Sequence, residues 1–294
     1  MPTFLKTILW ATDFSEEAKA ALFQAELLAR TFGAKLLAVH IVPEYSPALY
    51  DASPALDAEL LKRVKDSKDK MYSKMEALAK AEKISFDKII IQEGSAAHTI
   101  IELSEKEKAD LIVLGKKGHS ALENLLLGGV ANQVLRHSYI PLLLTHRRNK
   151  PAFNKILVPT DFSPREEVER DYAWKLAGGL KASLTFLHVL ELFHKFSPSE
   201  TEELFKSLHR KMQKRERAKG AAVPVSEEII RAMNAPTGIV EYAQEKRMDL
   251  IVISSLVHKL ERFFLGSTTE KVISLSPTSI FAIPSAVGRA PSKK

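Results

Sequence analysis

The chain has 294 residues, of which 45% are hydrophobic and 27% charged, and its formal net charge is +7. This length predicts two domains, and the composition is typical of globular proteins with a buried core. The absence of cysteine excludes disulfides and thiolate metal sites and is consistent with a reducing compartment. Without a signal-peptide pattern or an apolar run of roughly 20 residues, the sequence predicts a cytoplasmic protein with no membrane partner.

Basic residues gather at residues 62–74, 210–217 and 289–294. A basic balance can indicate nucleic acid or another anionic ligand. Acidic residues alternate with the basic ones in the first two stretches, in a helical pattern that is typical of a solvated helix face. We therefore do not expect nucleic acid as a partner, and we expect residues 287–294 to form a flexible tail.

Apolar runs and amphipathic stretches alternate along the first half of the chain. Strands are expected at residues 5–11, 35–42, 88–92, 110–114 and 140–145. Helices are expected at residues 15–30, 56–82 and 95–106, with a further one starting near residue 128. The apolar runs are typical of parallel strands covered on both faces, and repeated strand–helix units favour a doubly wound α/β sheet.

The second half repeats the first. Residues 8–15 and 156–163 are identical at six of eight positions, at an offset of 148. Asp110–Val113 recurs as Asp249–Val252 at an offset of 139, and Gly128 recurs as Gly266. We interpret this as a duplication into a domain at residues 1–148 and a second domain at 151–286. Strands of the second domain are expected near residues 155–159, 183–190, 226–232, 249–254 and 279–283.

A glycine-containing loop follows the fourth predicted strand of the first domain. Gly115 and Gly118 enclose two lysines, and nine residues later Gly128 opens a helix. Glycine lets backbone amides approach an anion, and a helix N-terminus carries partial positive charge. Ligands of doubly wound sheets bind beyond the carboxyl ends of the strands, where this loop lies. The loop therefore predicts a phosphate site, although glycines that serve only as turn and cap residues would give the same sequence.

The order of three motifs resembles the universal stress protein family over nearly the whole chain, twice. The first domain has Thr-Asp-Phe-Ser at residues 12–15, His-Ile-Val at 40–42 and G-x-x-G-x9-G from Gly115 to Gly128. The resemblance implies a five-stranded parallel, Rossmann-like fold in each domain. It also implies ATP binding between the end of the first strand and the glycine loop. Because members dimerise through their fifth strands, a tandem chain resembles a dimer fused into one polypeptide, an intrachain pseudo-dimer.

Both domains depart from the family's full motif, which ends in Ser or Thr after the last glycine. The first domain has Gly129 at this position, and the loss of one hydroxyl contact costs about 1 kcal/mol. The second domain keeps Ser267 after Gly266, but Ser254 and its neighbours replace the G-x-x-G. We therefore expect nucleotide mainly in the first domain and a degenerate second site.

The resemblance implies a set of nucleotide-binding residues in each domain. In the first domain these are Ala11, Thr12, Asp13, Ile41, Val42, Gly115, Lys116, Gly118, Gly128, Gly129 and Val130. In the second they are Pro159, Thr160, Asp161, Val189, Gly266, Ser267 and Thr268. Two roles stay open for Asp13, which either binds ribose or the Mg²⁺ of the nucleotide, or caps the following helix. His40 and His188 lie within strands, where histidine is more often structural.

No catalytic motif accompanies these residues. H-E-x-x-H, G-x-S-x-G and a cysteine nucleophile are all missing from the sequence, so we expect no dedicated catalysis beyond slow ATP hydrolysis. The main hypothesis is a stress-response regulator in which bound ATP shifts either the conformation of the protein or its choice of an unidentified protein partner. The alternative is an interaction scaffold of the same fold that binds no nucleotide. A homodimer of tandem chains is compatible with either hypothesis.

Overall fold

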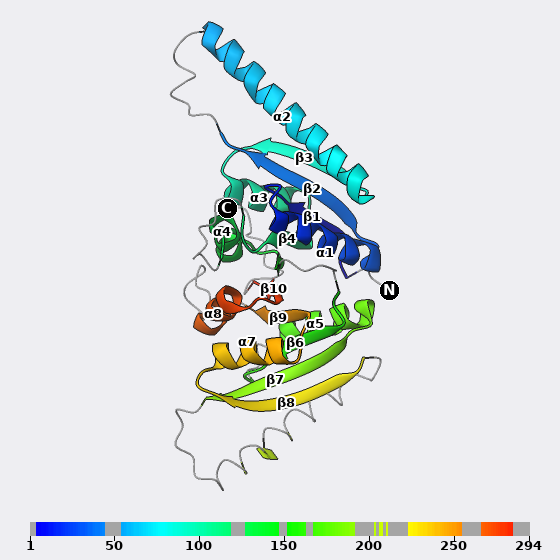
Figure 1. The fold of residues 1–294 in the computed structure, drawn as a ribbon, viewed down its shortest axis with the longest axis vertical. Coiled ribbons are helices and arrows are strands. Elements are labelled where there is room, and N and C mark those ends of the chain that lie inside the picture. Colours follow the sequence, from blue (N-terminus) through cyan, green and yellow to red (C-terminus); the bar gives the residue numbers. More distant parts are fainter. Residues whose placement is uncertain are drawn as a thin grey trace, which may run out of the picture. The chain divides into compact units, whose positions relative to one another are not determined.

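The computed structural model forms two compact units, unit 1 (Met1–Pro151) and unit 2 (Ala152–Lys294) (Figure 1). The residues that it describes are 4–44, 54–118, 127–146, 152–162, 167–191, 223–254 and 266–284, together with four positions between 203 and 210. The expected tail at 287–294 lies outside the described residues. None of the described helices is long and apolar enough to cross a membrane.

Unit 1 is a parallel sheet with helices between its strands. In sheet order the strands are β3 (Lys88–Glu93), β2 (Lys35–Val42), β1 (Thr7–Ala11), β4 (Leu111–Gly115) and β5 (Leu142–Thr145). The helices are α1 (Glu16–Phe32), α2 (Pro54–Glu82), α3 (Ala96–Lys106) and α4 (Gly129–His137). The strand order reverses at β1, which pairs with β2 on one side and β4 on the other. This reversal is the position at which doubly wound sheets bind their ligands.

Unit 2 has the same parallel topology. In sheet order its strands are β10 (Ser279–Ile283), β9 (Leu250–Ser254), β6 (Lys155–Pro159), β7 (Ser183–Glu191) and β8 (Val225–Ala232). Its described helices are α5 (Glu167–Leu180), α7 (Ala235–Glu245) and α8 (Ser267–Leu275). The two units confirm the predicted fold class, and each predicted strand and helix that falls on described residues is present.

Local chemistry sets the bounds of α1. Ser15 at the N-cap accepts a hydrogen bond from the Ala18 amide at 3.2 Å, and Gly33 at the C-cap adopts φ 66°. A left-handed residue of this kind costs glycine least, because it has no Cβ. The buried face of α1 consists mostly of small and aliphatic side chains, which lets the helix pack closely on the sheet.

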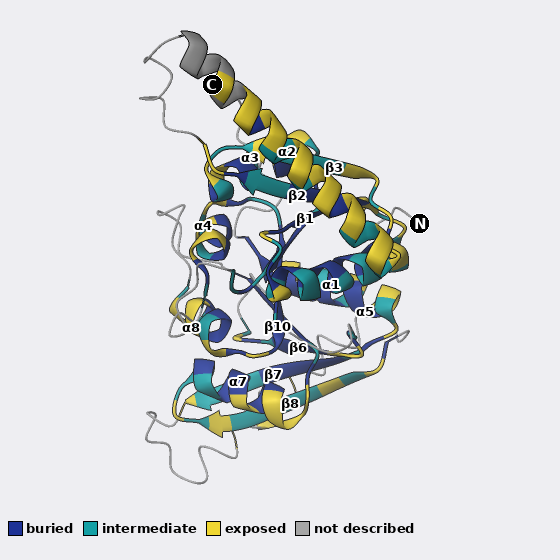
Figure 2. Cartoon of the chain, turned by 45° about the horizontal axis from the view of Figure 1, so that its top comes forward, coloured by how far each residue is buried: buried dark blue, intermediate teal, exposed yellow. Residues whose placement is uncertain are grey.

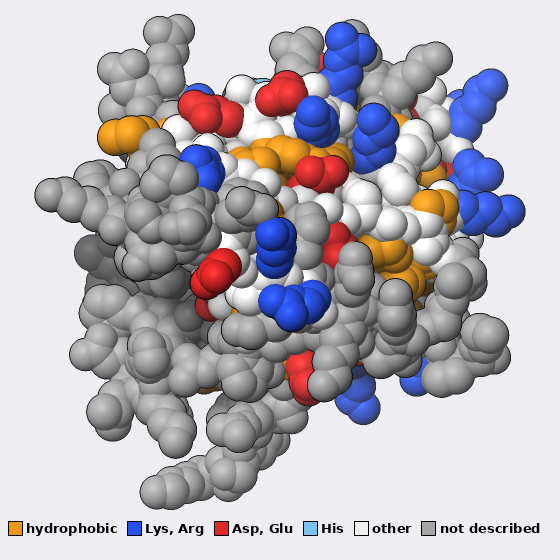
Figure 3. All heavy atoms as spheres, turned by 90° about the horizontal axis from the view of Figure 1, so that it is seen from below, with side chains coloured by type: hydrophobic (Ala, Val, Ile, Leu, Met, Phe, Trp, Pro, Cys, Tyr) orange, Lys and Arg blue, Asp and Glu red, His pale blue; other side chains and the backbone are white. Residues whose placement is uncertain are grey.

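The core of unit 1 lies between the sheet and its helices, as the burial of the strands shows (Figure 2). Trp10 on β1 is fully buried, stacks on Phe86 at a centroid distance of 5.8 Å and donates from Nε1 to the Ala18 carbonyl at 2.9 Å. The outer face of α2 is exposed along the helix (Figure 2). On the face in Figure 3, basic and acidic side chains are interspersed, as on a solvated surface.

Candidate functional site

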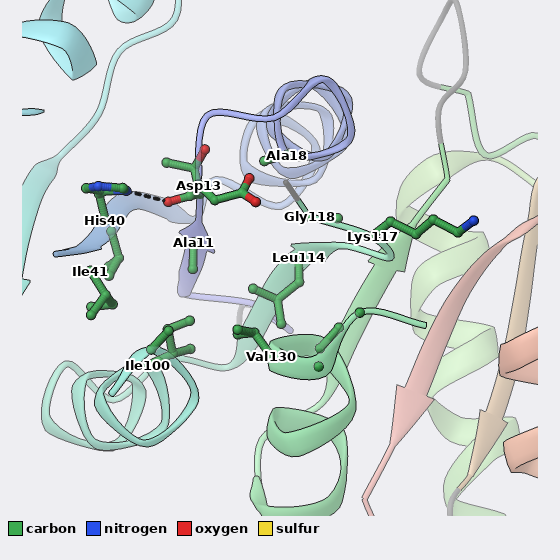
Figure 4. A pocket seen from close by; sticks show the side chains of 17 residues that line it. Ala11, Asp13, Ala18, His40, Ile41, Ile100, Leu114, Lys117, Gly118 and Val130 are labelled. Atoms are coloured by element: carbon green, nitrogen blue, oxygen red, sulfur yellow. Dashed lines mark hydrogen bonds between the residues drawn. The ribbon is translucent and has the colours of Figure 1, made fainter. Parts of the chain in front are cut away.

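A cavity of about 680 Å³, including its open mouth, lies at the carboxyl ends of β1, β2 and β4 (Figure 4). The lining residues are Ala11, Thr12, Asp13, Ala18, Val39, His40, Ile41, Ala96, Ile100, Leu114, Gly115, Lys117, Gly118, Gly128, Gly129, Val130 and Ala131. The cavity therefore lies where the strand order reverses, between the N-termini of α1, α3 and α4.

Nine of the eleven residues expected at the first site line this cavity, and the two others do not. Val42 is buried, and its carbonyl accepts the Gly94 amide at 3.1 Å. Lys116 is also buried, and its neighbour Lys117 lines the cavity instead. In Figure 4 the Lys117 side chain extends away from the other labelled residues, so this residue lines the cavity near its backbone.

Asp13 connects the end of β1 to the glycine loop. One carboxylate oxygen, Oδ1, accepts the Ser15 amide at 2.9 Å. The other, Oδ2, lies 2.5 Å from the position that a Cβ on Gly118 would take, so only glycine leaves room for the carboxylate. Asp13 thus supports the start of α1 and also lines the cavity, and the two roles considered for it are geometrically compatible.

The turn at residues 12–14 requires an unusual backbone. Phe14 has φ 63°, which is uncommon for a residue with a Cβ, and its amide donates to Thr12 Oγ1 at 2.9 Å. The Phe14 ring packs against His40 at 4.8 Å, with the Lys74 ammonium 4.1 Å from the ring centroid. This packing holds the turn in its left-handed conformation and fixes Asp13 at the edge of the cavity.

The other described glycines of the loop differ in how closely they lie against their surroundings. A Cβ on Gly115 would lie 2.9 Å from the Glu17 carbonyl carbon, so the end of β4 passes directly beside α1. The Gly128 amide donates to the Lys116 carbonyl at 2.9 Å, which closes the loop at the start of α4. At Gly129, by contrast, a Cβ would have no other atom within 4 Å. The described ends of the loop therefore present backbone to the cavity, with open space at Gly129.

His40 lines the cavity but also has a structural hydrogen bond. Its Nδ1 lies 2.7 Å from the Thr12 carbonyl, and since a carbonyl only accepts, Nδ1 carries the hydrogen (Figure 4). The structural role expected for this histidine is therefore present, together with a position at the cavity that sequence reasoning did not assign.

Sequence reasoning also missed the apolar wall that α3 contributes through Ala96 and Ile100. Its only signal was the place of α3 directly after a predicted strand of the sheet.

Burial, with a smaller effect of the Lys117 charge, lowers the pKa of Lys116 from 10.5 to about 8.

Unit 2 repeats the turn of unit 1. The Thr160 amide donates to the Leu187 carbonyl at 2.8 Å, and Thr160 Oγ1 accepts the amide of Phe162, which has φ 60°. Of the other expected residues, Pro159, Asp161 and Val189 lie at the carboxyl ends of β6 and β7, and Gly266, Ser267 and Thr268 at the start of α8. Residues 255–265, which would hold the second loop, lie outside the described residues.

The end of β9 differs from the end of β4. Where unit 1 has Gly115, unit 2 has Ser254, whose amide donates to the buried carboxylate of Glu169 at 2.7 Å. The Ser254 carbonyl accepts the Thr269 hydroxyl at 2.8 Å. Side chains of α5 and α8 thus bind both backbone groups of Ser254.

Comparison with known proteins agrees with this geometry. The universal stress protein family model matches residues 5–146 and 152–284. A universal stress protein of Methanocaldococcus jannaschii is 35% identical over 153 residues, which cover 49% of this chain and 84% of the relative. One of Thermus aquaticus is 36% identical over 139 residues, covering 47% and 97% respectively.

Among solved structures, a universal stress protein of Archaeoglobus fulgidus shares the fold over 99% of both chains, with a TM-score of 0.66 and 23% identity. The family model matches the two halves separately and together spans most of the sequence. The chain therefore belongs to the universal stress protein family, with two copies of the family domain in tandem.

Proposed function

We propose that unit 1 binds ATP and that the protein is a stress-response regulator without dedicated catalysis. The observation that carries this proposal is the cavity's division into two walls. Ile41, Ile100 and Val130 form an apolar wall suited to a purine (Figure 4). The described glycines at the two ends of the loop, with the start of α4, form a backbone wall suited to phosphate.

Substitution of the loop glycines tests the phosphate end of the proposed site. A Cβ on Gly118 would contact the Asp13 carboxylate, so the position of this carboxylate at the end of β1 depends on a glycine at residue 118. Asp13 is the residue that would hold the Mg²⁺ of the nucleotide or a ribose hydroxyl, because Mg²⁺ prefers oxygen ligands. When bound, Mg²⁺ would neutralise part of the phosphate charge. Within the described residues no group of three or more His, Asp or Glu side chains could hold a metal by itself.

Calorimetric titration of nucleotide-free protein with ATP and Mg²⁺ tests the proposal. Gly118→Ala should raise the Kd at least about tenfold, since the added methyl displaces the Asp13 carboxylate. The matched control is Gly178→Ala in α5, where a Cβ meets nothing within 4 Å. This control should leave the Kd unchanged.

Asp13→Asn separates the two roles of this residue. The amide oxygen can still accept the Ser15 amide, so folding stability should fall by less than about 1 kcal/mol. Binding of ATP with Mg²⁺ should weaken much more, because the negative charge is lost. Weakened binding in proportion to lost stability would show that Asp13 acts only as a cap.

The second candidate function is an interaction scaffold that binds no nucleotide. Gly129 favours it, because the hydroxyl that the family resemblance implies at this position is missing. No detectable binding up to millimolar ATP would leave the scaffold, whose unidentified protein partner would then be sought by capture with the intact chain.

A further inference from the structure

The helices α3 and α7 occupy corresponding places, each following the edge strand of its unit. Their N-caps are Ser95 and Asn234, at the same offset of 139 that relates β4 to β9. Both helices begin at the carboxyl ends of strands, on the side of the sheet where ligands of this fold bind. The two helix starts can therefore be compared position by position.

At the start of α7, side chains of unit 2 accept the first backbone amides of the helix. Asn234 Oδ1 accepts the Thr237 amide at 3.0 Å, and Glu191 Oε1 accepts the Ala235 amide at 2.8 Å. Pro236, which lies between Ala235 and Thr237, has no amide hydrogen. The first three positions of α7 therefore offer no free donor, and a carboxylate occupies the positive end of the helix.

The start of α3 has none of these groups. Ser95 makes no side-chain cap hydrogen bond, and the first turn contains no acidic residue. Pro43 stands where the offset of 148 places the counterpart of Glu191. Ala96, the first residue of α3, lines the cavity. In unit 1, then, Ala96 begins this helix as a residue that lines the cavity, and no side-chain cap bond from Ser95 closes the helix start.

A second carboxylate distinguishes the two units at the carboxyl ends of β4 and β9. Glu169 is only 8% exposed and binds the Ser254 amide, whereas its counterpart in α1 is Ala21, which has no polar side-chain atom. The counterpart of Ser254 is Gly115, which lines the cavity of unit 1. At two separate places, a carboxylate of unit 2 thus accepts a backbone amide whose counterpart in unit 1 belongs to a residue that lines the cavity, Ala96 or Gly115.

We infer that in unit 2 the carboxylates of Glu169 and Glu191 bind the backbone amides that a ligand would otherwise use. In unit 1 the corresponding amides at the start of α3 belong to the ligand site. A carboxylate oxygen and a phosphate oxygen both accept backbone N–H groups, and two such anions exclude each other by charge. Unit 1 takes an exchangeable anionic ligand, and unit 2 does not. This inference rests on the proposed function only in naming a nucleotide as that ligand.

Transplanting the carboxylate into unit 1 tests the role of α3. Pro43→Glu puts an acidic side chain at the position that corresponds to Glu191, so it should raise the Kd for ATP at least about tenfold. Pro43→Gln removes the same proline without adding charge, and its Kd should stay within about twofold of the wild-type value. Equal affinity in Pro43→Glu and Pro43→Gln would overturn the assignment of α3 to the ligand site.

Amide hydrogen exchange gives a readout that needs no nucleotide. In the wild-type chain the Ala235 amide should exchange at least about tenfold more slowly than the Ala96 amide, and Glu191→Ala should abolish this difference. Matching exchange at the two amides in the wild-type chain would overturn the inference for α7. If the chain binds no ATP, the proposed function fails, and the exchange experiment still decides whether unit 2 is occupied by its own carboxylates. Two ATP molecules per chain would overturn the inference while supporting the proposed function.

Discussion

Gly129 is the residue at which unit 1 lacks a side chain that a phosphate could use. Because nothing lies within 4 Å of a Cβ at this position, Gly129→Ser fits without rearrangement. One added hydroxyl contact is worth about 1 kcal/mol, so ATP affinity should rise about fivefold in calorimetric titration. Gly129→Ala is the control: it improves helix propensity by about 1 kcal/mol without adding a donor. Equal gains in affinity from both variants would point to helix stabilisation rather than to the hydroxyl.

Lys116 makes folding stability depend on pH. The folded chain releases the Lys116 proton near a pKa of about 8, whereas the unfolded chain keeps it up to about 10.5. Between these values the unfolded state binds more protons, so the stability of the folded state rises with pH. At about 1.4 kcal/mol for each pKa unit, this group adds roughly 2 kcal/mol between pH 7 and pH 9.5.

Urea denaturation at the two pH values measures this effect. Lys116→Met should be more stable than the wild-type chain near pH 7, and its advantage should shrink by roughly 2 kcal/mol near pH 9.5. A constant difference between the two proteins would contradict the assignment. The prediction concerns Lys116 alone, because the comparison with Met cancels the other groups that titrate in this range.

The two neighbouring lysines show where residue-level prediction from the sequence stops. The glycines on either side of Lys116 and Lys117 indicate a turn, and the position of the turn at the ligand edge follows from the order of elements. Which lysine is buried and which lines the cavity depends on the twist of the chain as it leaves β4, and no periodic pattern encodes that twist. We assigned Lys116 to the site; in the structure Lys116 is buried and Lys117 lines the cavity.

At the scale of elements, one aspartate holds the beginnings of two strands together in each unit. Asp110 Oδ2 accepts the amides of Lys6 and Thr7, at 2.7 and 3.0 Å, where β1 starts beside β4. Asp249 does the same for Asn154 and Lys155. The Asp-Leu-Ile-Val repeat of the sequence therefore has a structural cause that is separate from ligand binding.

Removing this carboxylate should destabilise unit 1 without affecting its ligand. Hydrogen bonds to charged groups are each worth about 1.5–3 kcal/mol, so Asp110→Ala should lower the free energy of unfolding by roughly 3 kcal/mol. Asp110→Asn keeps an acceptor and should recover about half of the loss. Chemical denaturation measures both, and an Asp110→Ala variant as stable as the wild-type chain would contradict this role. The Kd for ATP should be unchanged in both variants, since Asp110 lies at the opposite ends of the strands.

Most element types followed from hydrophobic periodicity, and the shifts in their bounds have local causes. The fifth strand was expected from residue 140 and begins at Leu142, because Pro141 has no amide hydrogen for the ladder. The first strand was expected from residue 5 and begins at Thr7, where Asp110 Oδ2 accepts the amides of Lys6 and Thr7. Such shifts depend on partners far away in the sequence, which a local pattern does not contain.

For the whole molecule, the duplication was visible in the sequence, but the way in which unit 2 differs from unit 1 was not. The missing G-x-x-G predicted a degenerate second site. The carboxylate of Glu169 could not be predicted, because it occupies a helical position where unit 1 has a buried alanine. Unit 1 has the fully buried Trp10 on β1, whereas unit 2 has the smaller, buried Val158 at the corresponding position of β6. The sequence alone did not indicate that these two replacements, Glu169 for Ala21 and Val158 for Trp10, belong together.

If unit 1 alone binds nucleotide, ATP should stabilise the two units unequally. A ligand that binds only the folded state at about 100 times its Kd adds about 2.7 kcal/mol to the free energy of unfolding. Hydrogen exchange under native conditions resolves this by unit, using core amides of β1 and β4 for unit 1 and of β6 and β9 for unit 2. We expect slower exchange by about two orders of magnitude in unit 1 and no change in unit 2. With Gly118→Ala at the same ATP concentration, a tenfold higher Kd should reduce the slowing in unit 1 from about one hundredfold to about tenfold or less. Equal slowing in both units would mean either that unit 2 also binds nucleotide or that the chain unfolds as one cooperative system, and the number of ATP molecules bound per chain separates these two explanations.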